Sequence, residues 1–223
     1  MGSDKDNLRM TTAKGALSHI KVLDVTTFLS GPFATQILGD LGADVIKVEQ
    51  ITGDDTRRLP PNFIGGDSAY YHSINRNKKS IAVNLRDTAG QDLVRRLATK
   101  SDVLIENMRP GGLDKYGLDY DSLSKLNPRL VYASISGFGQ DGPYRDHPAY
   151  DMVVQALSGG MSLTGDPEGR PVRAGIPIGD VAYAECTPLH RGRSTMVWQT
   201  RITRGDGRLC AIVTQTQMVL GPN

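Results

Sequence analysis

One carboxylate in this sequence is placed as a covalent nucleophile would be. Asp180 follows the apolar run Gly175–Gly179 (GIPIG), which predicts an extended segment that ends in glycine. Ligands of open α/β sheets bind beyond the carboxyl ends of the strands, and a small residue before the carboxylate lets a bulky substrate approach. The alternative is that Asp180 caps the following helix, because aspartate is a favoured N-cap residue. Spacing alone favours the cap.

The chain before Asp180 alternates strand and helix patterns. Short apolar runs predict strands at 20–26, 44–48, 80–85, 103–106 and 130–136, and helical spacing predicts helices at about 32–41, 88–99, 120–126 and 151–157. Residues 52–73 are rich in Gly, Pro, Asp and Arg and predict a long surface loop. This alternation predicts the α/β class, with a Rossmann-like, mostly parallel sheet covered by helices on both faces.

The pattern changes near Thr187. Residues 194–202 and 208–220 alternate with period two, and Arg204–Gly207 (RGDG) joins them. An Asp-Gly step between two such runs is a strong hairpin signal. We therefore expect a C-terminal antiparallel β-hairpin after the α/β domain.

Composition excludes several classes of partner. The net charge of the 223 residues is +2 and the charges are mixed along the chain, so nucleic acid is not an expected partner. Cys186 and Cys210 lack metal-ligand spacing, and the four histidines form neither a metal site nor a triad. No apolar run approaches the roughly 18 residues that span a bilayer, and residues 1–15 lack a secretory signal. These features predict a soluble cytoplasmic protein with free thiols and no metal.

An ordered set of motifs points to one family. These are LDVT at 23–26 with Gly31-Pro32, LGADVIKVE at 41–49, NRNKKS at 75–80, DVLIEN at 102–107, RPG at 109–111, LNPR at 126–129, GFG at 137–139 and YD at 150–151. Together they resemble the class III (CaiB/BaiF-type) coenzyme A transferases, a family that includes carnitine-CoA and formyl-CoA transferases and 2-methylacyl-CoA racemases. The resemblance covers about residues 17–180 and is more specific than any single motif.

The resemblance implies a reaction for Asp180. Its carboxylate would attack the carbonyl of an acyl-CoA, giving an acyl-aspartyl anhydride and CoA thiolate. The thiolate would then form an aspartyl-CoA thioester, from which CoA passes to an incoming carboxylic acid. Acyl-CoA and a small acid are thus the implied substrates, no cofactor is permanently bound, and the family's interlocked homodimer is the implied assembly.

The family's motifs also imply binding residues. The implied CoA contacts are Val83, Arg86, Asn107, Met108, Lys115 and Tyr116. Cations suit the phosphates, and apolar and aromatic side chains suit adenine. The alternative for the charged residues, Arg109 included, is solvated surface charge. The implied substrate-facing residues are Leu29, Tyr150 and Asp151.

Three positions depart from subgroups of the family. The formyl-CoA transferases, which this chain resembles, have a glutamine at the position of Leu29. The leucine argues against a formyl or oxalyl substrate. Gln50 stands where many members have an arginine near the nucleotide, which predicts weaker CoA binding. Tyr150 stands where racemases have a proton-exchanging histidine, which favours a transferase.

The tail carries a second resemblance. TPLHRGR at 187–193, MVW at 196–198, DGRL at 206–209 and TQTQ at 214–217 resemble the last strands of hot-dog acyl-CoA thioesterases. We expect a leader over 1–16, the N-terminal part of a CoA-transferase large domain over 17–186, and a hairpin tail over 187–223. The family's catalytic glycine loop, second domain and returning C-terminal helices find no match. The alternatives to CoA transfer are therefore a non-catalytic fragment that binds CoA, a thioesterase, or a racemase.

Overall fold

The computed structural model describes residues 15–166, 168–175 and 177, and the backbone of three later strands. Asp180 lies outside the described residues. The α/β part contains β1 (Lys21–Val25), α1 (Ser30–Asp40), β2 (Asp44–Glu49), η1 (Asp55–Arg58), β3 (Phe63–Ile64), β4 (Asp67–Ser68), α2 (Ala69–Asn75), β5 (Lys78–Ala82), α3 (Thr88–Ala98), β6 (Val103–Glu106), η2 (Asp114–Tyr116), α4 (Tyr120–Leu126), β7 (Val131–Ser134), α5 (Asp151–Leu157) and η3 (Gly160–Leu163).

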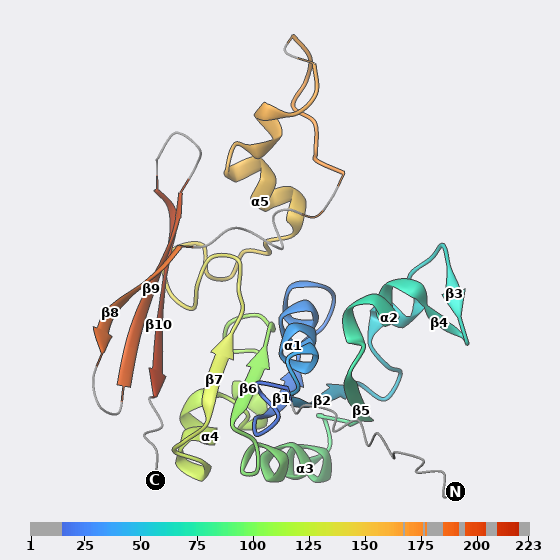
Figure 1. Cartoon of the computed structure of the whole chain (residues 1–223), viewed down its shortest axis with the longest axis vertical. Coiled ribbons are helices and arrows are strands. Elements are labelled where there is room, and N and C mark those ends of the chain that lie inside the picture. Colours follow the sequence, from blue (N-terminus) through green and yellow to red (C-terminus); the bar gives the residue numbers. More distant parts are fainter. Residues whose placement is uncertain are drawn as a thin grey trace, which may run out of the picture.

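Five parallel strands form the central sheet, in the order β5-β2-β1-β6-β7. Helices α3 and α4 cover one face and α1 covers the other (Figure 1). The strand order reverses between β1 and β6, so the carboxyl ends of these two strands form the topological switch point, where ligands of such folds bind. The predicted fold class is confirmed.

Successive residues of β1 and β6 point to opposite faces of the sheet, so these two strands contribute side chains to two hydrophobic cores. Leu23 and Leu104 are buried in a cluster that includes Val94 of α3, whereas Val22 and Ile105 belong to a second cluster on the opposite face. Strands that are apolar on both faces belong in a sheet covered on both sides. Full burial of a leucine contributes roughly 2 kcal/mol, so these positions fix the register of the central strands.

The segment between β2 and β5 contains more regular structure than the sequence pattern indicated. Residues 52–73 were expected as one surface loop, but they include a 3₁₀ turn, a two-residue strand pair and most of α2. Ser68 caps α2 by accepting a hydrogen bond from the Tyr70 N–H at 3.1 Å. The helix has seven residues and follows a stretch rich in Gly, Pro, Asp and Arg, whose composition indicated a loop.

The tail forms a three-stranded antiparallel sheet, with the order β10-β9-β8. Its strands are β8 (Glu185–Arg191), β9 (Thr195–Thr203) and β10 (Leu209–Met218). The two long strands confirm the expected hairpin. The third strand, β8, was not expected, because Pro188 interrupts its pattern; the register shifts between Pro188 and His190, and β8 lies at an edge of the sheet, where proline is tolerated.

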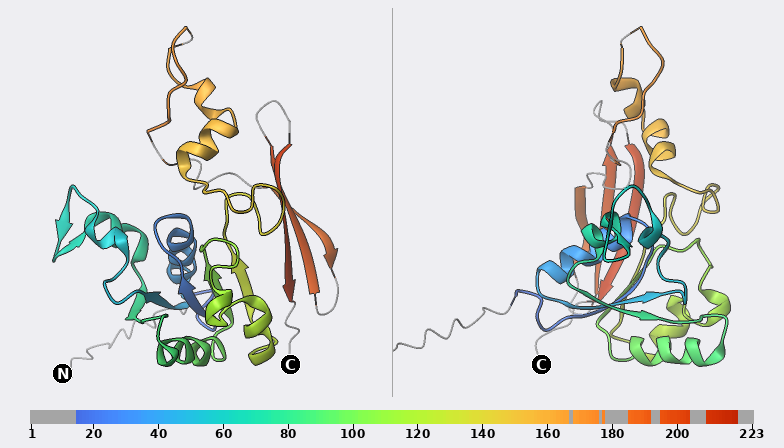
Figure 2. Two further views of the ribbon diagram at one scale, coloured as in Figure 1. Left: turned by 180° about the vertical axis from the view of Figure 1, so that it is seen from behind. Right: turned by 90° about the vertical axis from the view of Figure 1, so that its right-hand side faces the viewer.

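Helix α5 lies beyond the carboxyl edge of the parallel sheet, that is, the side on which the strands have their carboxyl ends (Figure 2). The chain reaches it from β7 through residues 135–150, which contain no helix or strand. Among the helices of the described residues, none combines the length and the apolar character needed to cross a bilayer.

Candidate functional site

At the switch point, the side chain of Asn107 joins the ends of β1 and β6. Its Oδ1 accepts a hydrogen bond from the Thr27 N–H at 2.9 Å, and its Nδ2 donates to the Thr27 carbonyl at 2.7 Å. Both the amide oxygen and one amide hydrogen are therefore used within the protein. Asn107 was predicted from the family resemblance to contact CoA; its position at the carboxyl edge is compatible with that, and its hydrogen bonds show that it also fixes the β1–α1 turn.

Beneath this turn lies a buried ion pair. The Asp24 carboxylate is fully buried, and it faces the Lys78 Nζ at 3.0 Å and accepts a hydrogen bond from the Thr35 hydroxyl at 2.6 Å. Lys78 also donates to the carbonyl of Pro32, in the first turn of α1, at 2.8 Å. Burial lowers the pKa of Lys78 to about 8, although the charge of Asp24 acts in the opposite direction. The pair ties β5 to the start of α1.

A second buried pair stands beside the first. Lys47 Nζ lies 2.9 Å from the Asp54 carboxylate, with side-chain exposures of 1% and 2%. Lys47 also donates to the Thr26 carbonyl at 2.7 Å, and so holds the start of the β1–α1 turn. Burial alone would raise the pKa of Asp54, but the charge and hydrogen bond of Lys47 outweigh it and the pKa is lowered. A buried pair is tolerated when its remaining groups are hydrogen-bonded, as they are here.

Glu49, at the end of β2, is the centre of a third buried network. Its carboxylate accepts two hydrogen bonds from Arg57, both at 2.7 Å, together with one from Tyr71 at 2.8 Å and one from Ser80 at 2.6 Å. Burial acts to raise the pKa of Glu49, but these hydrogen bonds prevail and lower it to about 2. The neighbouring Gln50 is exposed, so it faces solvent next to this rigid network.

The predicted CoA contacts have different surroundings. Val83, 5% exposed, packs in the core under α3, and Met108 packs against the same core. Arg86 and Lys115 are exposed, and each follows the carboxyl end of a strand, β5 and β6 respectively. Lys115 Nζ lies 4.9 Å from the centre of the Tyr116 ring. The two cations are thus accessible to phosphates, whereas the Val83 side chain offers a ligand little surface.

The predicted substrate-facing residues lie on two elements. Leu29 is half-buried at the N-cap position of α1, and Tyr150, 68% exposed, occupies the N-cap position of α5. Asp151 pairs with the Arg173 Nε at 3.1 Å and accepts hydrogen bonds from Gln155. Asp151 therefore also holds the segment that leads toward residue 180 against α5.

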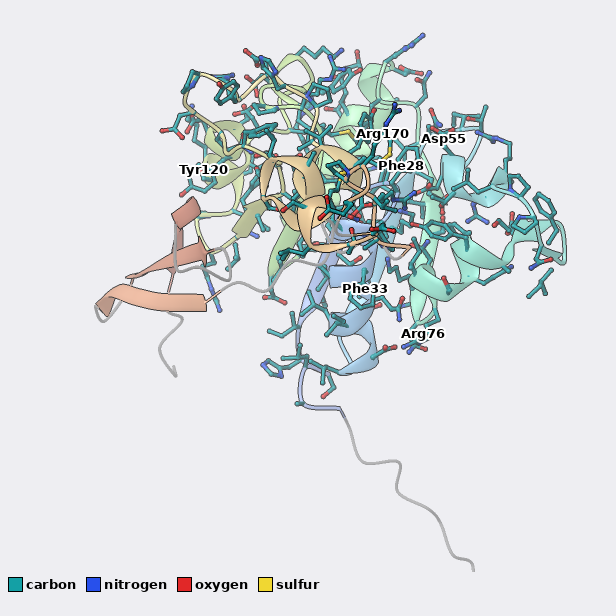
Figure 3. The ribbon with its side chains drawn as sticks, turned by 90° about the horizontal axis from the view of Figure 1, so that it is seen from above. Phe28, Phe33, Asp55, Arg76, Tyr120 and Arg170 are labelled. Atoms are coloured by element: carbon teal, nitrogen blue, oxygen red, sulfur yellow. The ribbon has the colours of Figure 1, made fainter. Side chains whose placement is uncertain are left out.

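A pocket of about 300 Å³ opens beside the switch point, at the carboxyl ends of β6 and β7. Glu106, Arg109 and Tyr132 contribute to its lining. Glu106 is 6% exposed, and burial raises its pKa despite a hydrogen bond from the Met108 N–H. Figure 3 views the molecule from the side on which these strands end.

The buried charges were not identified as site residues from the sequence. Asp24, Lys47 and Glu49 stand inside or at the end of apolar strand patterns. A charged residue within a buried strand requires a partner. The presence of these charges in apolar strand patterns was therefore the sequence signal for buried ion pairs. The sequence did not reveal which partners meet them, because Asp54 and Lys78 come from separate elements.

The model of CoA-transferase family III matches residues 17–190. This chain belongs to CoA-transferase family III. The family resemblance found in the motifs is thereby confirmed. A second model, the thioesterase superfamily, matches residues 173–211 and bears out the resemblance of the tail. The two matches overlap over 173–190, which includes Asp180.

Curated relatives carry related names. The chain is 50% identical over 179 residues to a succinate–glutarate CoA-transferase of Agrobacterium fabrum, covering 77% of this chain and 45% of that protein. It is 48% identical over 181 residues to human succinyl-CoA:glutarate CoA-transferase, covering 81% and 40%. It is 50% identical over 163 residues to an acetyl-CoA:oxalate CoA-transferase of Acetobacter aceti, covering 73% and 42%. The chain thus spans less than half the length of these relatives.

The fold agrees with the sequence comparison. A CAIB/BAIF family protein from Brucella suis superposes with a TM-score of 0.72 at 47% identity, over 75% of this chain and 45% of that one. The parallel sheet and its switch point therefore belong to a known family architecture.

Proposed function

We propose that this protein transfers coenzyme A from an acyl-CoA donor to a carboxylic acid, with Asp180 as the covalent nucleophile. The family match over 17–190, which includes Asp180, carries the proposal. The described part of the chain supports it with a switch point held by hydrogen bonds, and with the exposed cations Arg86 and Lys115 in the segments that follow β5 and β6. Such an edge suits a ligand with phosphates at one end and a reactive thioester at the other.

The chemistry proceeds in balanced steps. An Asp180 carboxylate oxygen forms a bond to the acyl carbonyl carbon, and the carbon–sulfur bond breaks, releasing CoA thiolate. The thiolate then attacks the Asp180 carbonyl carbon and expels the donor acid as its carboxylate. An acceptor carboxylate then attacks the aspartyl-CoA carbonyl carbon and expels CoA thiolate, which gives a new mixed anhydride. The thiolate attacks the acceptor's acyl carbon, forming the product acyl-CoA and releasing the Asp180 carboxylate. No external base is needed, because each nucleophile is already an anion at neutral pH.

The acceptor is proposed to be a small dicarboxylic acid. The names of the relatives include succinate, glutarate and oxalate, all of which are dicarboxylates. Leu29 replaces the glutamine of formyl-CoA transferases, which argues against an oxalyl group. Succinate and glutarate, the longer acids, are therefore the preferred candidates. Homodimer formation and a cytoplasmic location stay predictions from the sequence.

Acceptor dependence tests the proposal. Purified chain is incubated with succinyl-CoA, with and without glutarate, and the CoA esters are separated by chromatography. Transfer yields glutaryl-CoA only when glutarate is present. Release of free CoA at the same rate without an acceptor would contradict transfer. A chain that binds CoA without turnover would instead be the non-catalytic fragment.

Thioester hydrolysis is the second candidate function. The thioesterase-superfamily match over 173–211 and the three-stranded tail sheet favour it. The same experiment separates the two functions, because a thioesterase transfers the acyl group to water and does not need an acid.

A further inference from the structure

Glu106, the last residue of β6, differs from the other buried carboxylates of the described residues. It is 6% exposed, and its carboxylate accepts a hydrogen bond from the Met108 N–H at 2.7 Å. Within the described part of the chain no lysine or arginine pairs with it, whereas three other buried carboxylates each lie within 3.0 Å of a cation; those pairs are Asp24–Lys78, Glu49–Arg57 and Asp54–Lys47. An ionised buried carboxylate is stabilised mainly by a cation. Glu106 is therefore placed to bind a cation that comes from outside the described residues.

The Glu106 side chain contributes to the pocket of about 300 Å³ at the carboxyl ends of β6 and β7, and three aspartates of η2 and the start of α4 line the same pocket. Asp119 is already used, because its two oxygens accept hydrogen bonds from Ser122 at 2.9 and 2.7 Å. Asp114 and Asp121 are exposed, and neither side chain has a hydrogen bond or ion pair within the described residues. Burial, reinforced by the charge of Asp114, raises the pKa of Glu106. The pocket thus carries three carboxylates that no described cation neutralises.

Two tyrosine rings also line this pocket. Tyr120, the first residue of α4, is 54% exposed, and its ring meets the ring of the half-buried Tyr132 edge-on, with 6.0 Å between the ring centres. The Tyr132 hydroxyl donates to the Leu118 carbonyl at 3.1 Å, so this residue offers a ligand its ring and not its hydroxyl. Aromatic surface beside carboxylates favours a planar, weakly hydrated cation.

We propose that this pocket binds a guanidinium group. Guanidinium is planar, stacks on aromatic rings and presents several N–H donors in a fork that matches carboxylate oxygens. An ammonium group is compact and strongly hydrated, and it does not stack. A metal ion fits less well, because the described residues contain no group of three or more His, Cys, Asp or Glu side chains that could hold one.

This site is separate from the one proposed for coenzyme A. The phosphates of coenzyme A would be repelled by the carboxylates of the pocket. Tyr120, which lines the pocket, and Phe28, which lies in the turn after β1 at the switch point, lie apart in Figure 3. The inference therefore does not depend on CoA transfer.

Calorimetry with butylguanidinium tests the assignment, with butylurea as an uncharged compound of the same shape. At constant ionic strength we expect saturable binding of butylguanidinium, at least about tenfold tighter than that of butylurea. Glu106→Gln should weaken the binding of butylguanidinium about tenfold, because a charge-assisted hydrogen bond is lost. Asp92→Asn is the matched control: it removes the same charge from a side chain of α3 that is 63% exposed, and it should leave the dissociation constant within about twofold.

Arg109 supplies a change of opposite sign. It is exposed and lines the same pocket, so its charge opposes a bound guanidinium. Arg109→Gln should therefore strengthen the binding of butylguanidinium about twofold. Opposite effects of Arg109→Gln and Glu106→Gln, in variants that both unfold cooperatively, follow from charge in the pocket and not from a general loss of structure.

A further ligand identifies the source of the group. N-acetylarginine methylamide carries guanidinium as a polypeptide does. Binding as tight as that of butylguanidinium would identify the natural ligand as an arginine side chain, whereas its exclusion from the pocket would identify a free small molecule. In both cases the pocket is a guanidinium site.

Other outcomes would overturn the inference. These are equal affinity for butylguanidinium in Glu106→Gln and in the unaltered protein, equal affinity for butylurea or butylammonium, and no binding to unaltered protein that unfolds cooperatively. Binding only in Arg109→Gln would show that Arg109 itself fills the pocket. Competition by coenzyme A would make the pocket part of the coenzyme A site.

Discussion

The side chain of Asn107 and the backbone of Thr27 exchange two hydrogen bonds, of 2.9 and 2.7 Å, across the point where the strand order of the sheet reverses. Few side chains can satisfy a donor and an acceptor of one residue at once, and a primary amide is one that can. This link holds two loops at a fixed separation where the ligand is expected to lie.

We expect Asn107→Ala to lower the free energy of unfolding by roughly 1–3 kcal/mol, because the Thr27 N–H and carbonyl lose their partners in a half-buried place. Unfolding in denaturant measures this free energy for the variant and for the unaltered protein. Asn84→Ala is the control: the exposed Asn84 side chain accepts one hydrogen bond from the Arg86 N–H. An equal or smaller loss for Asn107→Ala than for Asn84→Ala would show that the link contributes little.

The acid stability of the protein should depend on Glu49. The folded pKa of about 2 lies below the ordinary value of 4.5. The unfolded chain therefore binds a proton first as pH falls, and the stabilisation, present above pH 4.5, is lost as pH falls toward 2. The full effect is about 3 kcal/mol, from about 1.4 kcal/mol per pKa unit.

This dependence is measured as the difference in unfolding free energy between the unaltered protein and Glu49→Gln, over the pH range from neutral to strongly acidic. The difference should shrink on acidification. Glu168→Gln, at an exposed position, should show no such change. A constant difference for Glu49→Gln would mean that the carboxylate network does not stabilise the ionised form.

Lys78 should make the protein more stable at alkaline pH. Its folded pKa of about 8 lies below the ordinary 10.5. Between these values the unfolded chain binds more protons than the folded chain, so stability rises with pH. At a pH one and a half units above the folded pKa, the gain is about 2 kcal/mol.

The pH dependence of unfolding is compared between the unaltered protein and Lys78→Met, which should lack this gain. Lys79→Met is the matched control, because Lys79 adjoins Lys78 in β5 but its side chain is 70% exposed. The control should retain the alkaline gain. A gain that persists in Lys78→Met would assign it to another group.

Periodicity predicted the elements that build the sheet. The runs at 44–48 and 103–106 correspond to β2 and β6, and the helices expected at 120–126 and 151–157 match α4 and α5. These segments succeed because their apolar residues recur with the period of the element that buries them. The short helix α2 and the edge strand β8 were missed because the first belongs to a segment rich in Gly, Pro, Asp and Arg and the second contains a proline.

The candidate site was predicted less completely than the fold. The family resemblance implied Arg86 and Lys115 as coenzyme A contacts, and both are exposed in the segments that follow β5 and β6. Lys47 and Lys78 stand within the motifs, but the sequence assigned them no role, because their ion-pair partners are more than five residues away in the chain. Pairings between separate elements follow from the folded topology, which a single sequence pattern does not contain. The sequence also did not predict the left-handed backbone conformation of Phe28 (φ 64°), which follows Thr27, a residue held by the distant side chain of Asn107.

The most direct test of the central claim, covalent catalysis by Asp180, is the intact mass of the protein after incubation with succinyl-CoA. We predict an adduct that hydroxylamine removes, that maps to the peptide containing Asp180, and that is absent from Asp180→Ala but present in the Asp141→Ala control. An adduct of equal yield in Asp180→Ala, or no adduct in protein with a cooperative unfolding transition, would contradict the claim.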